Sequence, residues 1–143
     1  MMRLFIIGTL ILFLGSCLNP PEYSPIPEIE FDSISSTFAV ANQDSITFFI
    51  TFTDGDGDLG SDEIPNLFFK DNRTLYTDSF KIPDITPDGN VKAISGRISY
   101  TFFPFNCIPG KDFDSLFFTI YVADRAGNNS NEVISPMITL QCD

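Results

Sequence analysis

A strict alternation of apolar and polar side chains over residues 45–53 constrains the fold of this chain more than any other feature. The large apolar residues on one parity are Ile46, Phe48, Ile50 and Phe52, and Ser or Thr fills most of the other parity. Successive side chains of an extended chain point to opposite sides, so this parity predicts a β-strand with one buried face.

The same alternation recurs along the chain, and no segment from residue 28 onward shows a convincing helical period. Strong strands are predicted over 45–53, 94–102, 115–123 and 132–141, and weaker ones over 29–40, 66–70 and 74–82. Turn sequences such as Asp-Gly and Pro-Gly separate them. About seven strands in roughly 115 residues indicate an all-β domain, an antiparallel Ig-like β-sandwich over 28–143. The chain has no Trp, so the Cys–Trp–Cys hallmark of true Ig domains is absent.

The parity also predicts which side chains are buried. In the later strands the predicted inward residues are Ile94, Ile98, Tyr100, Phe102, Leu116, Phe118, Ile120, Val122, Ile134, Pro136, Ile138 and Leu140. Pro136 cannot donate a ladder hydrogen bond, so the last strand is predicted to lie at an edge or to carry a bulge. Phe49, Phe117 and Tyr121 fall on outward positions, where they either mark a partner surface or are covered by a neighbouring strand.

Residues 1–17 read as an export signal. Arg3 precedes an apolar run of 11 residues from Leu4 to Leu14, about 16 Å as a helix and too short for a bilayer core that needs roughly 20 residues. The run ends in Leu14-Gly15-Ser16-Cys17, which resembles the lipobox of bacterial lipoproteins. The resemblance implies cleavage of a signal peptide, 1–16, and a diacylglyceryl thioether on Cys17.

The lipobox resemblance sets the expected location of the chain. It implies a lipid anchor that holds the protein to a membrane of the bacterial cell envelope, the outer membrane above all, with the domain facing the periplasm or the surface. Residues 17–27 contain Pro20, Pro21, Pro25 and Pro27, which favour a stiff, extended tether between the anchor and the domain.

The chain has three cysteines, an odd number for an exported protein. With Cys17 carrying lipid, Cys107 and Cys142 remain as a pair, and an oxidising compartment favours their disulfide. Strands that reverse direction one after another place both cysteines at one end of the domain. The same reversals place the connections 54–63, 83–91 and 124–131 at the other end.

The connection 54–63 holds five acids in ten residues. Asp54, Asp56 and Asp58 alternate with glycine, and carboxylate oxygens so arranged suit calcium, which takes 6–8 oxygen ligands. The stretch resembles the Asp-x-Asp-x-Asp calcium loops of EF-hands and thrombospondin type 3 repeats, although Leu59 and Pro65 depart from the EF-hand pattern.

Two further acids complete the predicted calcium ligands. The full candidate set is Asp54, Asp56, Asp58, Asp62 and Asp124, with a main-chain carbonyl of Asn128 or Asn129 as a further oxygen. Two alternatives stand beside it. Arg125 could neutralise the loop without metal, or the Asp-Gly repeats could be solvated turns only.

Residues 124–128, Asp-Arg-Ala-Gly-Asn, resemble the turn before the last strand of many bacterial Ig-like domains. Together with the lipobox and the acidic loop, they make the chain similar to a group of small bacterial lipoproteins. That resemblance implies an envelope address and an Ig-like fold, and it brings no established activity.

The composition of the chain argues against some classes of function. The net charge of −11 argues against a nucleic-acid partner, and the absence of His excludes mechanisms that need an imidazole. We expect a non-enzymatic binding or scaffold module for a protein or glycan partner. A carbohydrate-binding module is the alternative. A hydrolase with two carboxylates is more remote, because no acid is expected in apolar surroundings that would raise its pKa.

Overall fold

The computed structural model describes residues 22–86 and 93–142, and within these ranges the chain is all β. The predicted signal peptide lies outside the described residues, as do residues 17–21 of the tether, Cys17 among them. The strands are β1 (Glu28–Ile34), β2 (Phe38–Val40), β3 (Ile46–Asp54), β4 (Leu67–Asp71), β5 (Thr77–Phe80), β6 (Ile94–Phe102), β7 (Phe113–Leu116), β8 (Phe118–Val122), β9 (Val133–Ile134) and β10 (Ile138–Gln141). The all-β prediction is confirmed.

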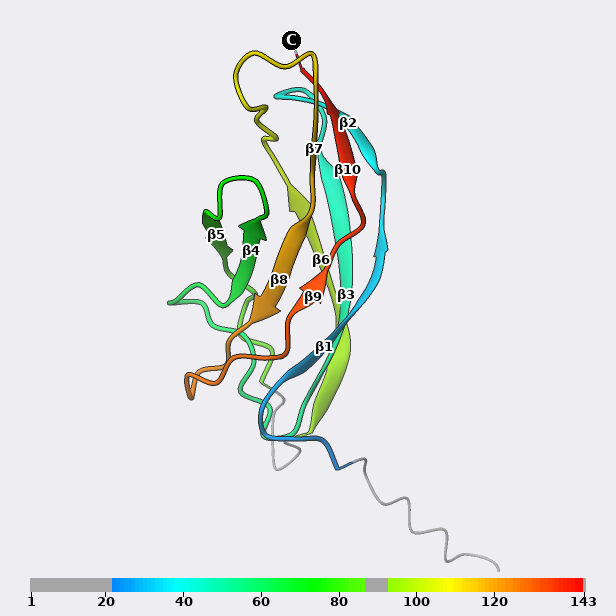
Figure 1. The fold of residues 1–143 in the computed structure, drawn as a ribbon. Coiled ribbons are helices and arrows are strands. Elements are labelled where there is room, and N and C mark those ends of the chain that lie inside the picture. The colour runs from blue at the N-terminus through cyan, green and yellow to red at the C-terminus, as the bar shows by residue number, and fades with distance from the viewer. Residues whose placement is uncertain (1–21, 87–92, 143) are drawn as a thin grey trace, which may run out of the picture.

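The strands form three small sheets (Figure 1). One sheet has the order β1-β3-β6, the second β5-β4-β8-β9 and the third β2-β10-β7. Every pairing is antiparallel except that of β2 with β10, which is parallel. Among the described residues there is no helix that could span a membrane.

Three of the predicted strands are each divided in two, which is why ten strands replace about seven. The segment 29–40 breaks between β1 and β2, and 115–123 begins earlier and breaks at Phe117. The segment 132–141 breaks around Pro136, where the chain leaves β8 and joins β7. The prediction that Ile134 is buried is wrong, because its side chain is 63% exposed. Across the break the parity changes, so Ser135 is buried in place of Ile134 and Pro136.

The core lies where the inward faces of the sheets meet. Phe48 of β3 packs edge-on against Phe69 of β4 and Phe118 of β8, with ring centroids 5.1 and 5.7 Å apart. All three phenylalanines are at most 1% exposed. Edge-to-face geometry is the favourable arrangement of aromatic pairs, so phenylalanine supplies here the large buried rings that Trp supplies elsewhere.

The domain has two contrasting ends, which we call the acidic pole and the disulfide pole. The acidic pole holds the described parts of the connections 54–63, 83–91 and 124–131, as predicted, and residues 22–27 that precede β1. The disulfide pole holds residues 103–112 and the C-terminal end of β10 (Figure 1). Cys107 and Cys142 form a disulfide there with their Cα atoms 5.9 Å apart, which confirms the predicted pair.

Candidate metal site

The acidic loop begins where β3 ends. Asp54 is the last residue of β3 and continues the buried parity of Phe52, so its side chain enters the domain and is 0% exposed. Gly57 has a φ of 70°, a left-handed conformation that glycine adopts without strain, and it turns the loop between Asp56 and Asp58. Leu59 then returns to the core with no exposed surface and fixes the end of the turn.

Three of the predicted ligands come together in this loop. Asp54, Asp56 and Asp58 each offer a carboxylate oxygen, and these oxygens lie within 4.8 Å of one another. Asp54 Oδ2 accepts a hydrogen bond of 2.8 Å from the main-chain N–H of Leu59, and Asp58 Oδ2 accepts one of 3.1 Å from that of Ala126. The arrangement confirms that an acidic cluster able to hold a metal ion exists here.

The second oxygens of two of these carboxylates are buried without a partner. Asp54 Oδ1 and Asp58 Oδ1 are the buried side-chain polar atoms of the described residues that make no hydrogen bond. Buried polar atoms are almost always paired, because an unpaired one loses its bond to water without replacement. Both orphaned atoms lie in one cluster of acids, and both are oxygens.

Electrostatics inside the cluster oppose ionisation. Burial raises the pKa of Asp54, and the neighbouring Asp56 raises it further. Burial also raises the pKa of Asp58, with added repulsion from the charges of Asp124, Asp56 and Asp54. The expectation that no acid has surroundings that raise its pKa is therefore wrong, since a strand carries Asp54 into the interior. A bound cation would relieve both effects.

The remaining two predicted ligands make other contacts. Asp62 is exposed, and its Oδ1 accepts a hydrogen bond of 3.3 Å from the main-chain N–H of Asp84. Asp124 is buried, and its two oxygens accept hydrogen bonds of 2.7 and 2.8 Å from the main-chain N–H and the side-chain amide of Asn128. Asp124 thus closes its own turn, and its effect on the cluster is through its charge.

Arg125 does not neutralise the cluster. Its Nη1 donates to the carbonyl of Gly60 at 3.1 Å and to Asp84 Oδ1 at 2.8 Å, and its Nη2 donates to Thr86 Oγ1 at 2.6 Å. The hydrogen bonds from Thr86, followed by the one from Arg125, lower the pKa of Asp84 to about 2. Arg125 thus links the connection 124–131 to the connections 54–63 and 83–91. It does not neutralise the charges of the acidic cluster.

The ligand atoms that the acidic cluster offers indicate which class of ion it suits. The cluster offers carboxylate oxygens and no nitrogen or sulfur, which suits a hard cation such as calcium. Neither a family model, nor a curated protein, nor a solved structure matches this chain. The assignment of the site therefore depends on its geometry.

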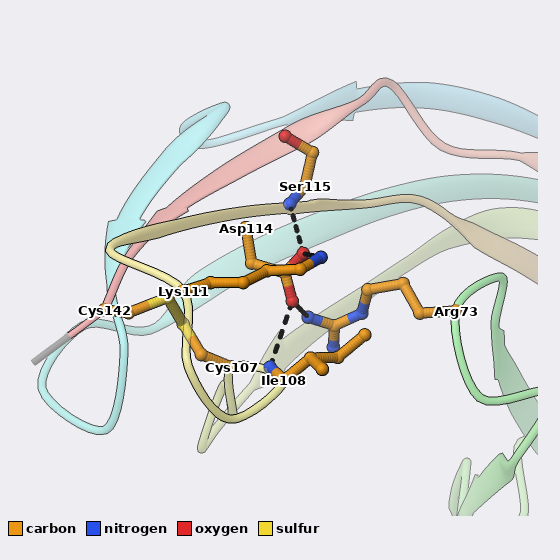
Figure 2. Close-up of a disulfide and its surroundings, with 7 residues drawn as sticks. All are labelled: Arg73, Cys107, Ile108, Lys111, Asp114, Ser115 and Cys142. Carbon is orange, nitrogen blue, oxygen red and sulfur yellow. Dashed lines mark hydrogen bonds and ion pairs between the residues drawn. A yellow bond between two sulfur atoms is a disulfide. The ribbon is translucent and has the colours of Figure 1, made fainter.

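The sequence did not reveal a second group of buried charges at the disulfide pole. Figure 2 shows Asp114 surrounded by Arg73, Lys111 and the main-chain N–H groups of Ile108 and Ser115. Arg73 Nη1 and Lys111 Nζ lie 2.7 Å from its Oδ2 and Oδ1. Although burial opposes ionisation, these donors hold the pKa of Asp114 far below its usual range. A sequence signal exists, because Asp114 shares the buried parity of Leu116.

Arg73 also connects this group to β4. Its Nη2 lies 2.6 Å from Asp71 Oδ2, and its Nε donates to the same carboxylate. Burial acts against the charge of Asp71, but the bonds from Arg73 prevail and lower its pKa. We call Asp71, Arg73, Lys111 and Asp114 the ionic cluster.

Two of the outward aromatic residues have neighbours that cover them. The guanidinium carbon of Arg97 lies 4.1 Å from the ring centroid of Phe49. Tyr121 stacks on Phe68 with ring centroids 4.7 Å apart. Phe117 is half-buried. These contacts agree with the alternative that neighbouring strands cover the outward aromatic side chains.

Proposed function

We propose that this chain is a lipid-anchored envelope protein whose Ig-like β-domain is a non-enzymatic binding or scaffold module, stabilised by calcium at Asp54, Asp56 and Asp58. The observation that carries the proposal is the pair of buried oxygens without partners, Asp54 Oδ1 and Asp58 Oδ1. Calcium supplies the missing partner for both and offsets the repulsion that raises their pKa values.

The order of the strands supports the Ig-like part of the proposal. In Ig domains two antiparallel sheets pack face to face. The sheets β1-β3-β6 and β5-β4-β8-β9 share one aromatic core through Phe48, Phe69 and Phe118. The second strand, β2, also pairs in parallel with the C-terminal strand β10, so strands from the two ends of the domain sequence lie side by side.

The lipobox at Leu14–Cys17 supports the lipid anchor. The contacts of the tether with the acidic loop connect this anchor to the proposed calcium site. The main-chain N–H of Gly55 donates to the carbonyl of Ser24 at 2.7 Å, and a side chain at Gly55 would lie 2.2 Å from the carbonyl of Tyr23. The segment before β1 therefore lies against the acidic loop. A calcium ion in that loop would stabilise the point where the tether meets the domain.

Calcium titration tests the metal site. The full chain, purified in mild detergent, should melt at a higher temperature as calcium is added, because the ion binds only the folded state. The double variant Asp54→Asn with Asp58→Asn should lose this shift. Asp62→Asn, in the same loop but outside the cluster, should keep it. Absence of a shift at about 10 mM calcium, well above the usual range of weak extracellular sites, would leave the loop as solvated turns.

The anchor has a separate test. When the full chain is expressed in a bacterium, we expect it in the membrane fraction with the added mass of a lipidated N-terminus at Cys17. Cys17→Ser should abolish the modification, because serine has no thiol to alkylate. Unmodified wild-type protein in that host would contradict the lipoprotein proposal and would leave the calcium proposal unaffected.

A further inference from the structure

A cavity of about 400 Å³ opens at the disulfide pole, between the β4–β5 hairpin and the segment 104–109. Its volume lies within the range of small-molecule sites, roughly 300–1,000 Å³. Its apolar lining includes Phe102, Phe105 and Phe118, and Tyr76 borders it with a side chain that is 67% exposed. The segments that line it lie away from the acidic loop (Figure 1), and the cavity shares no residue with the cluster of Asp54, Asp56 and Asp58.

The charges beside this cavity do not balance. Asp71, Arg73 and Asp78 line it. The charge of Arg73 is shared between Asp71 and Asp114, and Lys111 also contacts Asp114. The ionic cluster is therefore neutral, with two cations for two anions. Asp78 is the acid left without a cation.

Asp78 lies on the inward parity of the edge strand β5, opposite Phe69 of β4, and it is half-buried. Among residues 22–86 and 93–142, its carboxylate makes no hydrogen bond or ion pair that would neutralise it. Burial, followed by the charge of Asp71, raises its pKa. A half-buried carboxylate in the same cavity as the exposed ring of Tyr76 is a favourable partner for an external cation, which gains the ion pair and contact with that ring.

We propose that this cavity binds a small organic cation, with its ammonium group on Asp78 and its apolar body against Tyr76 and Phe102. An inorganic ion would leave the apolar lining in water, and an organic anion would meet Asp78 as a like charge. A neutral apolar molecule would leave the carboxylate unpaired. The ligand class that satisfies the whole lining is an amine with an aromatic or aliphatic body.

The cavity is held in shape before any ligand enters. Its wall at 104–109 is fixed by the disulfide of Cys107 with Cys142 and by the hydrogen bond of 3.1 Å from the main-chain N–H of Ile108 to Asp114. Arg73 fixes the hairpin to the same carboxylate. A site fixed in this way loses less conformational entropy on binding than a loose one.

Three ligands of one shape test the proposal by calorimetry on the full chain in mild detergent. 2-Phenylethylamine is the cation, 2-phenylethanol the neutral analogue and phenylacetate the anion. We expect the amine to bind at least about tenfold more tightly than the other two, the factor worth about 1.4 kcal/mol. Equal binding of the three, or no binding of the amine up to about 10 mM, would overturn the proposal.

Variants place the cation on Asp78. Asp78→Asn keeps the shape of the side chain and should remove the tenfold preference for the amine. Asp112→Asn, an exposed acid at the same pole, should preserve it and so controls for attraction to the net negative charge. If Asp78→Asn fails to fold, Tyr76→Ala serves instead, since its side chain is mostly exposed, and it should weaken the amine severalfold. Unchanged amine affinity in a folded Asp78→Asn protein would refute the proposed site.

Discussion

The acidic cluster and the ionic cluster both contain buried aspartates, Asp54 in the first and Asp71 and Asp114 in the second, and their electrostatics are opposite. In the ionic cluster Arg73 and Lys111 supply charge, and the pKa of Asp114 falls. In the acidic cluster no basic side chain of the described residues contacts the carboxylates, and the pKa of Asp54 rises. The charge of a buried aspartate beside a basic side chain is neutralised within the protein. The charge of one without such a neighbour needs an ion from outside to neutralise it.

Loss of Arg73 should break the ionic cluster and produce the largest effect. Arg73→Met leaves Asp71 and Asp114 buried with one partner removed, which should cost about 3–5 kcal/mol of unfolding free energy. Urea denaturation with and without the substitution measures this. A cost below about 1 kcal/mol would show that the cluster behaves as a surface pair, contrary to the burial of Asp114.

Removal of the disulfide should rank next. The double variant Cys107→Ala with Cys142→Ala frees a loop with a sequence separation of 35 residues. Loop-closure entropy gives about 4 kcal/mol for such a loop, with about 2–5 kcal/mol as the usual range for native disulfides. Urea denaturation measures the loss. The calcium-dependent gain in stability should stay the same, because the acidic pole lies at the other end of the domain.

Calcium should stabilise the protein only through the acidic pole. At about 10 mM, a site with Kd of about 10⁻⁴ to 10⁻³ M adds about 1.4–2.7 kcal/mol. Arg73→Met should show the same increment on a lower baseline, because distant sites act additively. A smaller increment in that variant would mean that the two clusters are coupled.

The two clusters should respond to acid in opposite directions. Since folding raises the pKa values of Asp54 and Asp58, the metal-free protein is penalised at neutral pH, and the penalty disappears as pH falls through the raised values. Since folding lowers the pKa values of Asp71 and Asp114, their stabilisation is full above the ordinary aspartate value of 3.8 and is lost as pH falls below it.

Unfolding free energy measured against pH without calcium separates these contributions. Asp54→Asn with Asp58→Asn should be more stable than the parent at pH 7, with the difference vanishing in mild acid. The deficit of Arg73→Met should shrink as pH falls, first as the buried carboxylates left without Arg73 are protonated in the variant, and then as the parent loses its own stabilisation below the ordinary value of 3.8. Parallel curves for all three proteins would contradict the contrast between the clusters.

The smallest expected effect is that of Arg125→Met. The ion pair of Arg125 with Asp84 is exposed and solvent-screened, so its loss should lower the unfolding free energy by less than any of the changes above. The same urea denaturation measures it. A larger loss would show that the contacts of Arg125 with Gly60 and Thr86 hold the acidic pole together.

The alternation of apolar and polar residues predicted most of the strands, and it also indicated which acids are buried. The strand over 94–102 and the inward faces of β3 and β8 follow directly from alternation. Asp54, Asp71 and Asp114 each continue the buried parity of a strand. The alternation therefore indicates buried positions for them, whereas their charge favours the surface.

Long-range geometry could not be read from the alternation. Nothing local in the sequence shows that Arg73 reaches Asp114, which lies 41 residues away, or that Arg125 contacts Asp84 in preference to the acidic cluster. The change of parity at Pro136 also depends on which sheet each half of the segment joins. Such contacts are set by the packing of sheets, which the period of one strand does not encode.

The attachment of residues 22–27 at the acidic pole decides how the domain would carry mechanical force. A pull on the tether acts along the axis of β1, which begins at that pole and is paired with β3 over most of its length. The hydrogen bonds between these strands then bear the load together in shear, and they do not open one after another as in unzipping. If the anchored protein were pulled from its opposite end, the β1–β3 pair would bear the force first.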